Sequence, residues 1–210
     1  ERVIALSTDK ACNPVNLYGA SKLASDKIFI AANNFAGAHR TRFAVVRYGN
    51  VLGSAGSVVP FFRQLIAEGT DHLPITDPRM TRFWITLTQG VDFVLSSFAL
   101  MRGGEIFVPK IPSTSIVDLA RCLAPDLPTR IVGIRPGEKL HETMISADDA
   151  RDTVDLGDRY VIEPRIDYFT RRRFETGTPV PADFAYSSDR NDARLDIEAF
   201  RTMLAAGDVT

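Results

Sequence analysis

The sequence is poor in cysteine, with only Cys12 and Cys122 among 210 residues. They lie far apart and lack CxxC or Cys/His spacing, which argues against a disulfide framework and a zinc site and is typical of a reducing cytoplasm. An excess of either charge is also missing, since 25 lysines and arginines stand against 26 aspartates and glutamates, giving a net charge of −1. The chain therefore has no general attraction for nucleic acid.

Long apolar segments are missing as well. The longest apolar stretch, near residues 91–101, is too short to cross a bilayer and contains Asp92, and no signal peptide is visible. With 45% apolar and 24% charged residues, the composition predicts a soluble, cytoplasmic globular protein without a membrane partner.

A dinucleotide fingerprint is absent too. No GxGxxG follows a strand pattern, and the GSAGS at residues 53–57 has the wrong glycine spacing. The sequence begins at Glu1, without a methionine, and enters an apolar run at residues 3–6. We therefore expect the chain to be the later part of a longer protein, and we expect these residues alone to be inactive and to bind NADP poorly.

The pattern that is present predicts an α/β fold. Short β-rich runs alternate with helical patterns at the start, which is typical of βαβ units and a parallel sheet. We expect the C-terminal half of a doubly wound, Rossmann-like parallel sheet at residues 1–57, and a smaller α/β substrate-binding lobe at 58–164 with some segments returning to the main sheet. A C-terminal extension follows at 165–210. The predicted strands are 3–6, 43–48, 73–76 and 104–108, with an extended segment at 131–134, and the predicted helices are 18–33, 60–67, 87–100, 115–123, 140–145 and 197–204.

Tyr18 and Lys22 lie four residues apart at the start of the first predicted helix, so both side chains project from one face. An ammonium beside a phenol favours the phenolate, and such a pair can exchange a proton with a substrate hydroxyl. By spacing alone the pair is weak evidence, because an ordinary helix surface produces it too.

The position of the pair strengthens the argument. It follows a buried strand whose carboxyl end contains Asp9 and Lys10, and the next strand ends at Tyr48 and Asn50. Ligands of open α/β sheets bind outside the carboxyl ends of the strands. An acid and a base side by side suit elimination of water, in which one group protonates the leaving hydroxyl and another removes a carbon-bound proton. A solvated ion pair in a loop is the alternative for Asp9 and Lys10.

The stretch STDKACNPVNLYGASKLASDK at residues 7–27 resembles the catalytic segment of the UDP-N-acetylglucosamine 4,6-dehydratases of the inverting type. These lyases belong to the extended short-chain dehydrogenases and begin pseudaminic acid synthesis. Further motifs agree in order, and the resemblance covers residues 3–164: VVRYGNVLGS at 45–54, SVVPFF at 57–62, ITDPRMTRFWITL at 75–87, GEIFVPKIPS at 104–113 and GIRPGEKLHE at 133–142, with YSSDRN near Tyr186.

The resemblance implies roles for these residues. Tyr18, held by Lys22, would assist hydride removal from sugar C4 to NADP, with Tyr48 also at the cofactor. Lys10 would contact the substrate and remove the C5 proton, and Asp9 would protonate the departing C6 hydroxyl. Hydride would return to C6, and protonation at C5 from the opposite face would invert that carbon. Retaining relatives have aspartate then glutamate at this pair, so Lys10 favours the inverting class.

The second lobe is expected to bind the nucleotide. By resemblance, the residues that contact the UDP part of the sugar nucleotide are Asn50, Arg82, Arg135 and Glu138. Guanidinium groups suit a diphosphate, and a carboxylate can accept from ribose hydroxyls. Surface or turn-capping roles are the alternatives for these four residues. The family usually has arginine where Ala55 stands here, which puts phosphate or subunit contacts at that position in doubt.

Two rival functions remain open at this point. A nucleotide-sugar 4-epimerase or a retaining 4,6-dehydratase would share Tyr18 and Lys22, but an epimerase needs no acid such as Asp9. A truncated, non-catalytic homologue that binds a UDP-sugar or a partner subunit is the rival from another class. The preference for NADP over NAD and the substituent at sugar C2 are not encoded in this segment, and a homo-oligomer is expected from the family alone.

Overall fold

The computed structural model describes residues 1–36, 41–165 and 174–207. The chain divides into two compact units, each built from segments that are not contiguous in sequence. The first unit comprises Glu1–Tyr48, Val91–Lys110 and Thr143–Ser187, and the second comprises Gly49–Gly90, Ile111–Glu142 and Ser188–Thr210. Both units combine helices with strands, so the predicted α/β class is confirmed. Among the described helices, none has the length and apolar character needed to cross a membrane.

A six-stranded sheet of order β1-β2-β6-β11-β10-β12 organises the first unit. Strands β1 (Arg2–Thr8), β2 (Arg42–Tyr48) and β6 (Ile106–Pro109) run parallel, as the alternation of strands and helices predicts. An antiparallel extension follows, which the sequence analysis did not predict. It consists of three short strands, β11 (Arg159–Ile162), β10 (Thr153–Asp155) and β12 (Thr178–Pro179).

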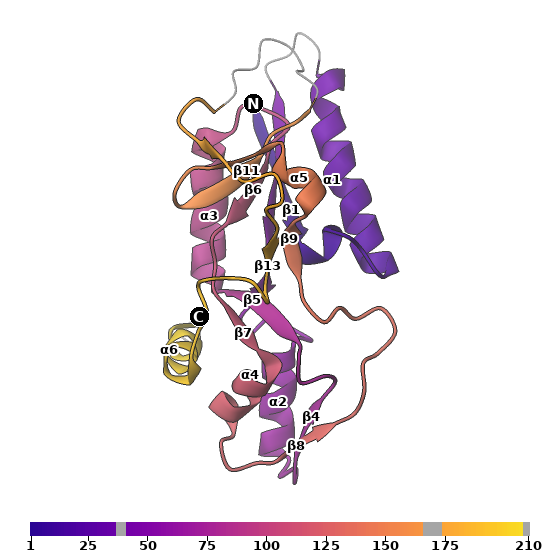
Figure 1. The fold of residues 1–210 in the computed structure, drawn as a ribbon, viewed down its shortest axis with the longest axis vertical. Coiled ribbons are helices and arrows are strands. Elements are labelled where there is room, and N and C mark those ends of the chain that lie inside the picture. Colours follow the sequence, from indigo (N-terminus) through magenta and orange to yellow (C-terminus); the bar gives the residue numbers. More distant parts are fainter. Residues whose placement is uncertain (37–40, 166–173, 208–210) are drawn as a thin grey trace. The chain divides into compact units, whose positions relative to one another are not determined.

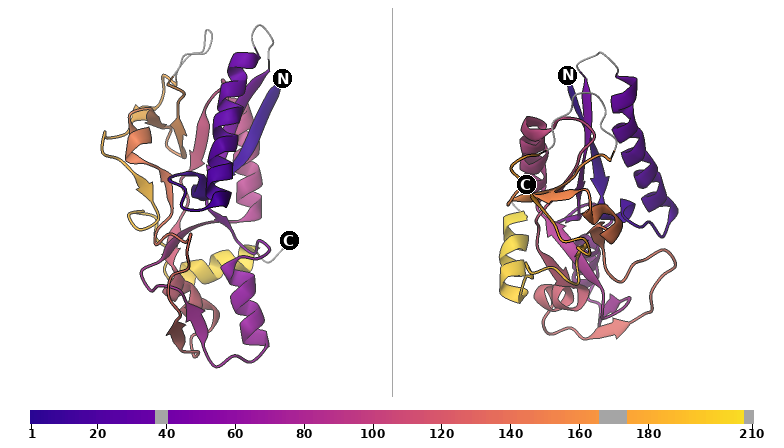
Figure 2. Two further views of the ribbon diagram at one scale, coloured as in Figure 1. Left: turned by 90° about the vertical axis from the view of Figure 1, so that its right-hand side faces the viewer. Right: turned by 45° about the horizontal axis from the view of Figure 1, so that its top comes forward.

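Helices α1 (Leu17–Phe35) and α3 (Leu87–Leu100) flank the parallel strands on opposite faces (Figure 1, Figure 2). Successive side chains of a strand point to opposite faces of the sheet. Phe43 of β2 accordingly packs against Phe29 of α1, with ring centroids 6.4 Å apart. Val46 of the same strand instead shares a buried cluster with Phe93 of α3. Coverage of both faces by helices is what a doubly wound sheet requires.

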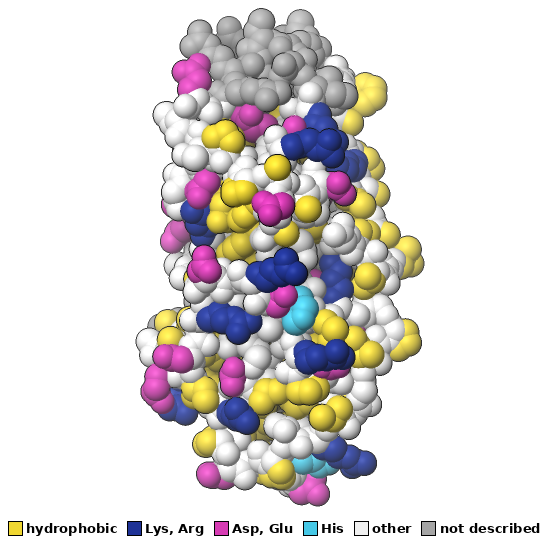
Figure 3. Space-filling view, viewed as in Figure 1, with side chains coloured by type: hydrophobic (Ala, Val, Ile, Leu, Met, Phe, Trp, Pro, Cys, Tyr) yellow, Lys and Arg dark blue, Asp and Glu magenta, His cyan; other side chains and the backbone are white. Residues whose placement is uncertain are grey.

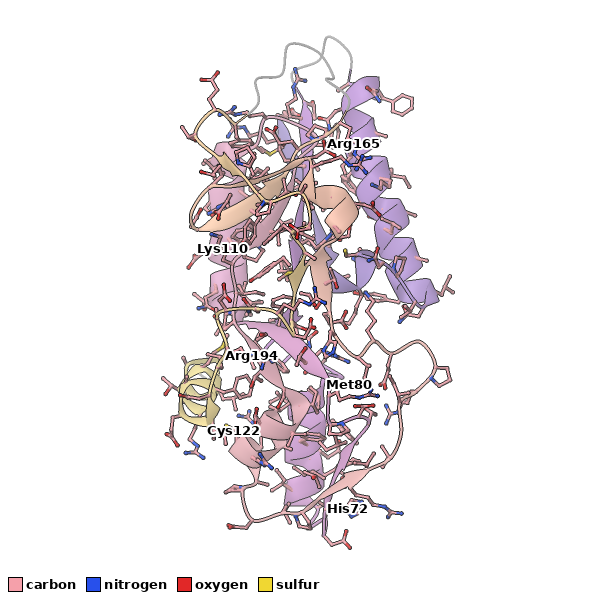
Figure 4. The ribbon with its side chains drawn as sticks, in the orientation of Figure 1. His72, Met80, Lys110, Cys122, Arg165 and Arg194 are labelled. Carbon is pink, nitrogen blue, oxygen red and sulfur yellow. The ribbon has the colours of Figure 1, made fainter. Side chains whose placement is uncertain are left out.

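One predicted helix of the chain is wrong. Residues 140–145 do not form the predicted helix, because Thr143–Ile145 is strand β9, paired antiparallel with β13 (Tyr186–Ser187). Pairing with a distant segment decides the conformation here, and local sequence does not contain that information. The short helix α5 (Ala147–Ala150) follows β9. Lys110, labelled in Figure 4, connects the end of β6 to the antiparallel extension by a 2.8 Å bond to Asp155 Oδ2.

The described residues of the second unit form two small sheets and three helices around one apolar core. Its sheets are β3 (Asn50–Val51), β5 (Thr81–Ile85) and β7 (Ser113–Ser115), and the pair β4 (Leu73–Ile75) and β8 (Thr129–Ile131). Its helices are α2 (Val58–Ala67), α4 (Ile116–Leu123) and α6 (Ile197–Gly207). The rings of Trp84 and Phe200 pack together in the core at a tilt, with their centroids 5.3 Å apart.

Most of the predicted elements are confirmed in type. The five predicted helices at 18–33, 60–67, 87–100, 115–123 and 197–204 correspond to α1, α2, α3, α4 and α6, and the four predicted strands correspond to β1, β2, β4 and β6. The extended segment predicted at 131–134 overlaps β8 only at Ile131, because β8 takes its register from β4. Cys12 and Cys122, both among the described residues, are buried thiols that are not joined in a disulfide, and burial raises the pKa of the Cys122 thiol.

The charged side chains of both signs are interspersed on the face drawn in Figure 3. This distribution agrees with the near balance of 25 basic and 26 acidic residues in the sequence. On this face, a binding site for a phosphate group would therefore depend on a few local cations.

One buried ion pair joins α1 to the sheet. Arg47 Nη2 lies 3.1 Å from Asp26 Oδ2, and the two side chains are only 4% and 1% exposed. Arg47 Nη1 also donates to the carbonyl oxygen of Met144 at 2.8 Å, so the guanidinium links β2, α1 and β9.

Loss of this carboxylate is expected to destabilise the protein strongly. Asp26→Asn leaves the Arg47 charge buried without its counter-ion, and we expect the free energy of unfolding in urea to fall by about 3–5 kcal/mol. Glu198→Gln is the control, because Glu198 pairs with Arg201 at 2.6 Å but is 79% exposed, and we expect a loss below about 1 kcal/mol. Equal losses in the two variants would contradict the prediction.

Candidate active site

Asp9 and Lys10 follow the carboxyl end of β1 in a single turn of 3-10 helix, η1 (Asp9–Ala11). Thr8 ends the strand and holds the turn. Its hydroxyl accepts from the Lys10 backbone N–H at 3.4 Å and donates to Asp9 Oδ1 at 2.9 Å. The Thr8 side chain thus caps the turn, as is usual for Thr at an N-cap position, and its hydroxyl also orients the Asp9 carboxylate. Thr8 is not among the predicted site residues, although a Thr between a strand and an acidic residue is a recognisable N-cap signal.

Asp9 is completely buried, with 0% of its surface exposed. Its Oδ1 also lies 3.0 Å from Lys10 Nζ, and the Lys10 side chain is 32% exposed. Its Oδ2 is buried and has no hydrogen-bond partner among the described residues. Buried carboxylate oxygens are normally hydrogen-bonded, and functional sites are a common reason for an exception. This atom is therefore a candidate contact for a substrate hydroxyl.

Helix α1 places Tyr18 and Lys22 next to this turn. The helix begins with Asn16 as N-cap, whose side chain accepts from the Gly19 N–H at 2.8 Å. Tyr18 in the first turn is 53% exposed. Lys22 lies one turn later and directs its ammonium to the carbonyl oxygen of Leu6 in β1, at 3.3 Å. The phenol is thus accessible, and the ammonium is anchored at the end of β1.

Tyr48 ends β2 directly beside Thr8, since the two residues are paired in the parallel register. Burial raises the pKa of Tyr48, and the neighbouring Tyr18 raises it further. Tyr48 therefore keeps its proton at neutral pH and can act as a hydrogen-bond donor. The first unit thus brings together five predicted site residues at the ends of β1 and β2: Asp9, Lys10, Tyr18, Lys22 and Tyr48.

The other four predicted residues belong to the second unit. Asn50 lies in β3 opposite Trp84 of β5. Arg135 and Glu138 form one tight turn, in which the Glu138 N–H donates to the Arg135 carbonyl and Glu138 Oε2 accepts from the Arg135 N–H, both at 3.1 Å. The Arg135 side chain is exposed at the surface of this turn. It is the predicted cation in this unit that remains most accessible to an anionic ligand.

The Arg82 guanidinium, unlike that of the exposed Arg135, is bound to the backbone of its own unit. Its Nη1 donates to the carbonyl oxygens of Thr81 at 2.7 Å and Leu140 at 3.1 Å, and its Nη2 donates to that of Lys139 at 3.0 Å. Its Nη2 also lies 3.6 Å from the sulfur of Met80, which is labelled in Figure 4. The guanidinium therefore fastens the segment that follows the Arg135 turn onto β5.

A hydroxyl network reinforces the same attachment. Ser188 Oγ accepts from the Glu142 N–H at 3.0 Å, donates to the Thr81 carbonyl at 3.1 Å, and lies 2.6 Å from Thr81 Oγ1. Thr81 Oγ1 also hydrogen-bonds His141 Nδ1 at 2.9 Å. The network of Thr81, His141 and Ser188 was not predicted, because residues so far apart in the chain share no local sequence pattern. Within residues 1–36, 41–165 and 174–207, no group of three His, Cys, Asp or Glu side chains is gathered for a metal ion.

Comparison with known proteins gives one family and close relatives. The family model described as "Polysaccharide biosynthesis protein" matches residues 1–164. The UDP-N-acetylglucosamine 4,6-dehydratase (inverting) of Campylobacter jejuni is 61% identical over 198 residues, which cover 91% of this chain and 59% of that protein. The UDP-glucose 4-epimerase of Rickettsia canadensis is 38% identical over 97% of this chain and 61% of that protein. The chain thus spans about three fifths of the length of these curated relatives.

Solved structures support the fold. Pen from Bacillus thuringiensis superposes on 100% of this chain and 64% of its own, with a TM-score of 0.87 and 29% identity. DesIV from Streptomyces venezuelae, a dTDP-glucose 4,6-dehydratase solved with NAD and TYD bound, covers 66% of this chain and 49% of its own, with a TM-score of 0.54 and 23% identity. The DesIV similarity concerns the fold alone.

Ser188→Ala is expected to weaken the second unit. The substitution removes the oxygen that accepts from the Glu142 N–H and one of the two partners of the Thr81 hydroxyl, and we expect the free energy of unfolding to fall by about 1–3 kcal/mol. Thr202→Ala is the control, because the Thr202 hydroxyl bonds Glu198 on the exposed face of α6, and a change within about 0.5 kcal/mol is expected. A Ser188 variant as stable as the control would contradict the network's importance.

Tyr48 is expected to ionise above the ordinary range of tyrosine. Because its pKa is raised in the folded protein, its contribution to stability is complete below about pH 10 and is lost as the pH rises through the raised pKa. The difference in tyrosinate absorbance between the wild type and Tyr48→Phe should therefore have its midpoint above about pH 10 in the folded protein and near that value in urea. A folded midpoint at or below the urea value would contradict this expectation.

Proposed function

Since this chain belongs to the polysaccharide biosynthesis protein family, we propose that it contains the catalytic residues of an NADP-dependent, inverting UDP-N-acetylglucosamine 4,6-dehydratase. The identity of 61% with the dehydratase of Campylobacter jejuni supports this assignment. The single structural observation behind it is the buried Asp9 carboxylate with Lys10 at 3.0 Å, next to the Tyr18 helix. An acid and a base in contact are what removal of water from adjacent carbons needs.

The Asp9 and Lys10 pair can supply both proton transfers of the elimination. An ionised pair has the base protonated and the acid deprotonated, so one proton must first pass from Lys10 Nζ to the Asp9 carboxylate with which it is hydrogen-bonded. The neutral Lys10 then removes the proton from sugar C5. The protonated Asp9 gives its proton to the C6 hydroxyl, which leaves as water. The pair ends as it began, ionised, and the proton count is conserved.

Tyr18 and Lys22 act at sugar C4. Tyr18 is the accessible group beside η1, and in its phenolate form it would take the proton of the C4 hydroxyl as C4 loses hydride and the ketone forms. The ketone makes the neighbouring C5 proton acidic enough for Lys10 to remove. After water has left, a proton delivered to C5 on the opposite face gives the inverted product, UDP-2-acetamido-2,6-dideoxy-β-L-arabino-hex-4-ulose. This compound would be the first intermediate of pseudaminic acid synthesis in the cytoplasm.

The residues at this end of the sheet fit the nicotinamide part of a dinucleotide. Lys22 has three N–H donors, and the Leu6 carbonyl takes one of them, so a ribose hydroxyl can be bound as well. Tyr18 and Tyr48 offer hydroxyl groups on the neighbouring helix and strand ends. A bound NADP would supply the acceptor for hydride from C4 and the donor of hydride to C6. Tyr18, Lys22 and Tyr48 are the residues proposed to hold it.

The second unit is proposed to bind the UDP part of the substrate. The exposed Arg135 guanidinium is suited to the diphosphate, because its planar donors match phosphate oxygens. Glu138 and Asn50 would accept or donate to the nucleoside. Arg82 would act on the same ligand together with the segment that it fastens. A homo-oligomer of the complete protein is part of the proposal and rests on the family.

A nucleotide-sugar 4-epimerase is the second candidate function, and the Rickettsia canadensis epimerase at 38% identity favours it. An epimerase would use Tyr18 and Lys22 but would not need Asp9 as an acid. A retaining dehydratase would replace the base Lys10 with a carboxylate. The buried Asp9 and the adjacent lysine therefore favour the inverting dehydratase over both alternatives.

The test is proton NMR of the full-length natural protein with UDP-N-acetylglucosamine in deuterated buffer. We expect a 4-keto-6-deoxy product with inverted C5 that has acquired deuterium. Asp9→Asn should lower the rate by roughly 10²- to 10⁴-fold, whereas Asp148→Asn, at a 94% exposed carboxylate, should leave it unchanged. Inversion at C4 alone, with Asp9→Asn still active, would show an epimerase instead. An untouched substrate would leave only a binding role.

A further inference from the structure

Gly19 is buried, although the residues on either side of it in the first turn of α1 are exposed. Its N–H donates to the side chain of the N-cap residue Asn16 at 2.8 Å, which fixes the start of the helix. The side of Gly19 that would hold a Cβ atom faces η1. There the backbone of Lys10 approaches more closely than any other residue type would permit.

The distances define this approach. A Cβ atom added at Gly19 would lie 2.4 Å from the Lys10 carbonyl oxygen, 3.0 Å from Pro14 Cβ and 3.3 Å from the Lys10 carbonyl carbon. Real Cβ atoms essentially never approach a heavy atom closer than 3.0 Å. The atom in the way belongs to the backbone, so no side-chain rotation can relieve the contact. Any larger residue at position 19 must move α1 away from η1.

The Lys10 backbone cannot yield easily either. The Thr8 hydroxyl accepts from the Lys10 N–H, and the Cys12 N–H closes the turn on the Asp9 carbonyl at 3.2 Å. Asp9 inside this turn is completely buried. The close approach of Gly19 to the Lys10 carbonyl therefore joins two well-fixed segments. One is the η1 turn, which contains Lys10, and the other is the first turn of α1, which contains Tyr18.

We infer that Gly19 is a positioning residue that sets the separation between Lys10 and Tyr18, and so couples proton removal at C5 to oxidation at C4. The inference rests on the proposed function. Tyr18 acts on the C4 hydroxyl and Lys10 on the C5 proton, which are groups on adjacent carbons of one ring. The two side chains must therefore stay at a fixed spacing, and a misplacement of about 1 Å can reduce a rate 10²-fold.

The experiment compares Gly19→Ala with Gly90→Ala in the full-length natural protein. Gly90 is the matched control, because it also lies in a helix, α3. Apart from its chain neighbours and its own helix backbone, no described atom lies within 4 Å of a Cβ added there. For Gly19→Ala we expect kcat to fall roughly 10- to 100-fold with KM changed less than about twofold. Exchange of the C5 proton for deuterium should fall with kcat, and the formation of reduced cofactor in a single turnover should fall less. Gly90→Ala should keep the wild-type kcat.

A structural measurement accompanies the kinetics. Crystal structures of the two variants should show a longer distance between the Lys10 and Tyr18 Cα atoms in Gly19→Ala only. If Gly19→Ala does not fold, Asn16→Ala provides the second test, since it releases the first turn of α1. We expect kcat to fall roughly 3- to 10-fold for Asn16→Ala and to recover in Asn16→Ser, which restores a capping oxygen.

The outcomes separate this inference from the proposed function. A wild type that is active, with Gly19→Ala matching Gly90→Ala in kcat and in structure, overturns the role of Gly19 alone. If cofactor reduction and C5 exchange fall by the same factor in Gly19→Ala, the role of Gly19 is also overturned. The coupling between oxidation at C4 and proton removal at C5 would then be unchanged. A wild-type protein that makes no dehydrated product contradicts the proposed function, and the distance between Lys10 and Tyr18 in the variant still decides whether Gly19 sets the spacing.

Discussion

The burial of the Asp9 carboxylate is the constraint on which the arrangement of the first unit depends. A completely buried acid is costly unless other groups compensate it, because transfer from water removes its hydration. The Thr8 hydroxyl and the Lys10 ammonium both bind Oδ1, at 2.9 Å and 3.0 Å, whereas Oδ2 has no partner among the described residues. Only Oδ1 of the buried carboxylate is therefore compensated for its lost hydration. Oδ1 thus orientates the carboxylate, and under the proposed function Oδ2 is the oxygen available to the substrate.

The scaffold around this group restricts movement in each direction. Strand β1 fixes Thr8 through its register with Tyr48 of β2, and α1 closes the other side through the backbone contact between Gly19 and Lys10. The buried pair of Asp26 and Arg47 holds α1 on the sheet at a distance from the site. Buried ion pairs contribute little net stability but are costly to break. This pair therefore acts more as a restraint on the position of α1 than as a source of stability.

Periodicity and chain order were enough to predict the parallel core, because β1, α1 and β2 are contiguous and their apolar residues follow one pattern each. The position of Asp9, Lys10, Tyr18 and Lys22 at one end of the sheet follows from the same rule. The antiparallel extension and β9 were not predictable, since their pairing is decided by segments distant in sequence. Motif resemblance identified residues such as Arg82 but said nothing of their hydrogen bonds.

Arg82 shows how the structure changes the meaning of a motif residue. The resemblance to the family assigns the Arg82 guanidinium to the diphosphate, yet three backbone carbonyls accept hydrogen bonds from its Nη1 and Nη2. Arginine suits this task because its planar group offers five donors in fixed directions, which a lysine ammonium does not. A guanidinium held so firmly can still attract a nearby anion by its charge, but it cannot turn to follow one. Under the proposed function, the recognition of the ligand would fall to the exposed Arg135, and Arg82 determines where the segment next to Arg135 lies.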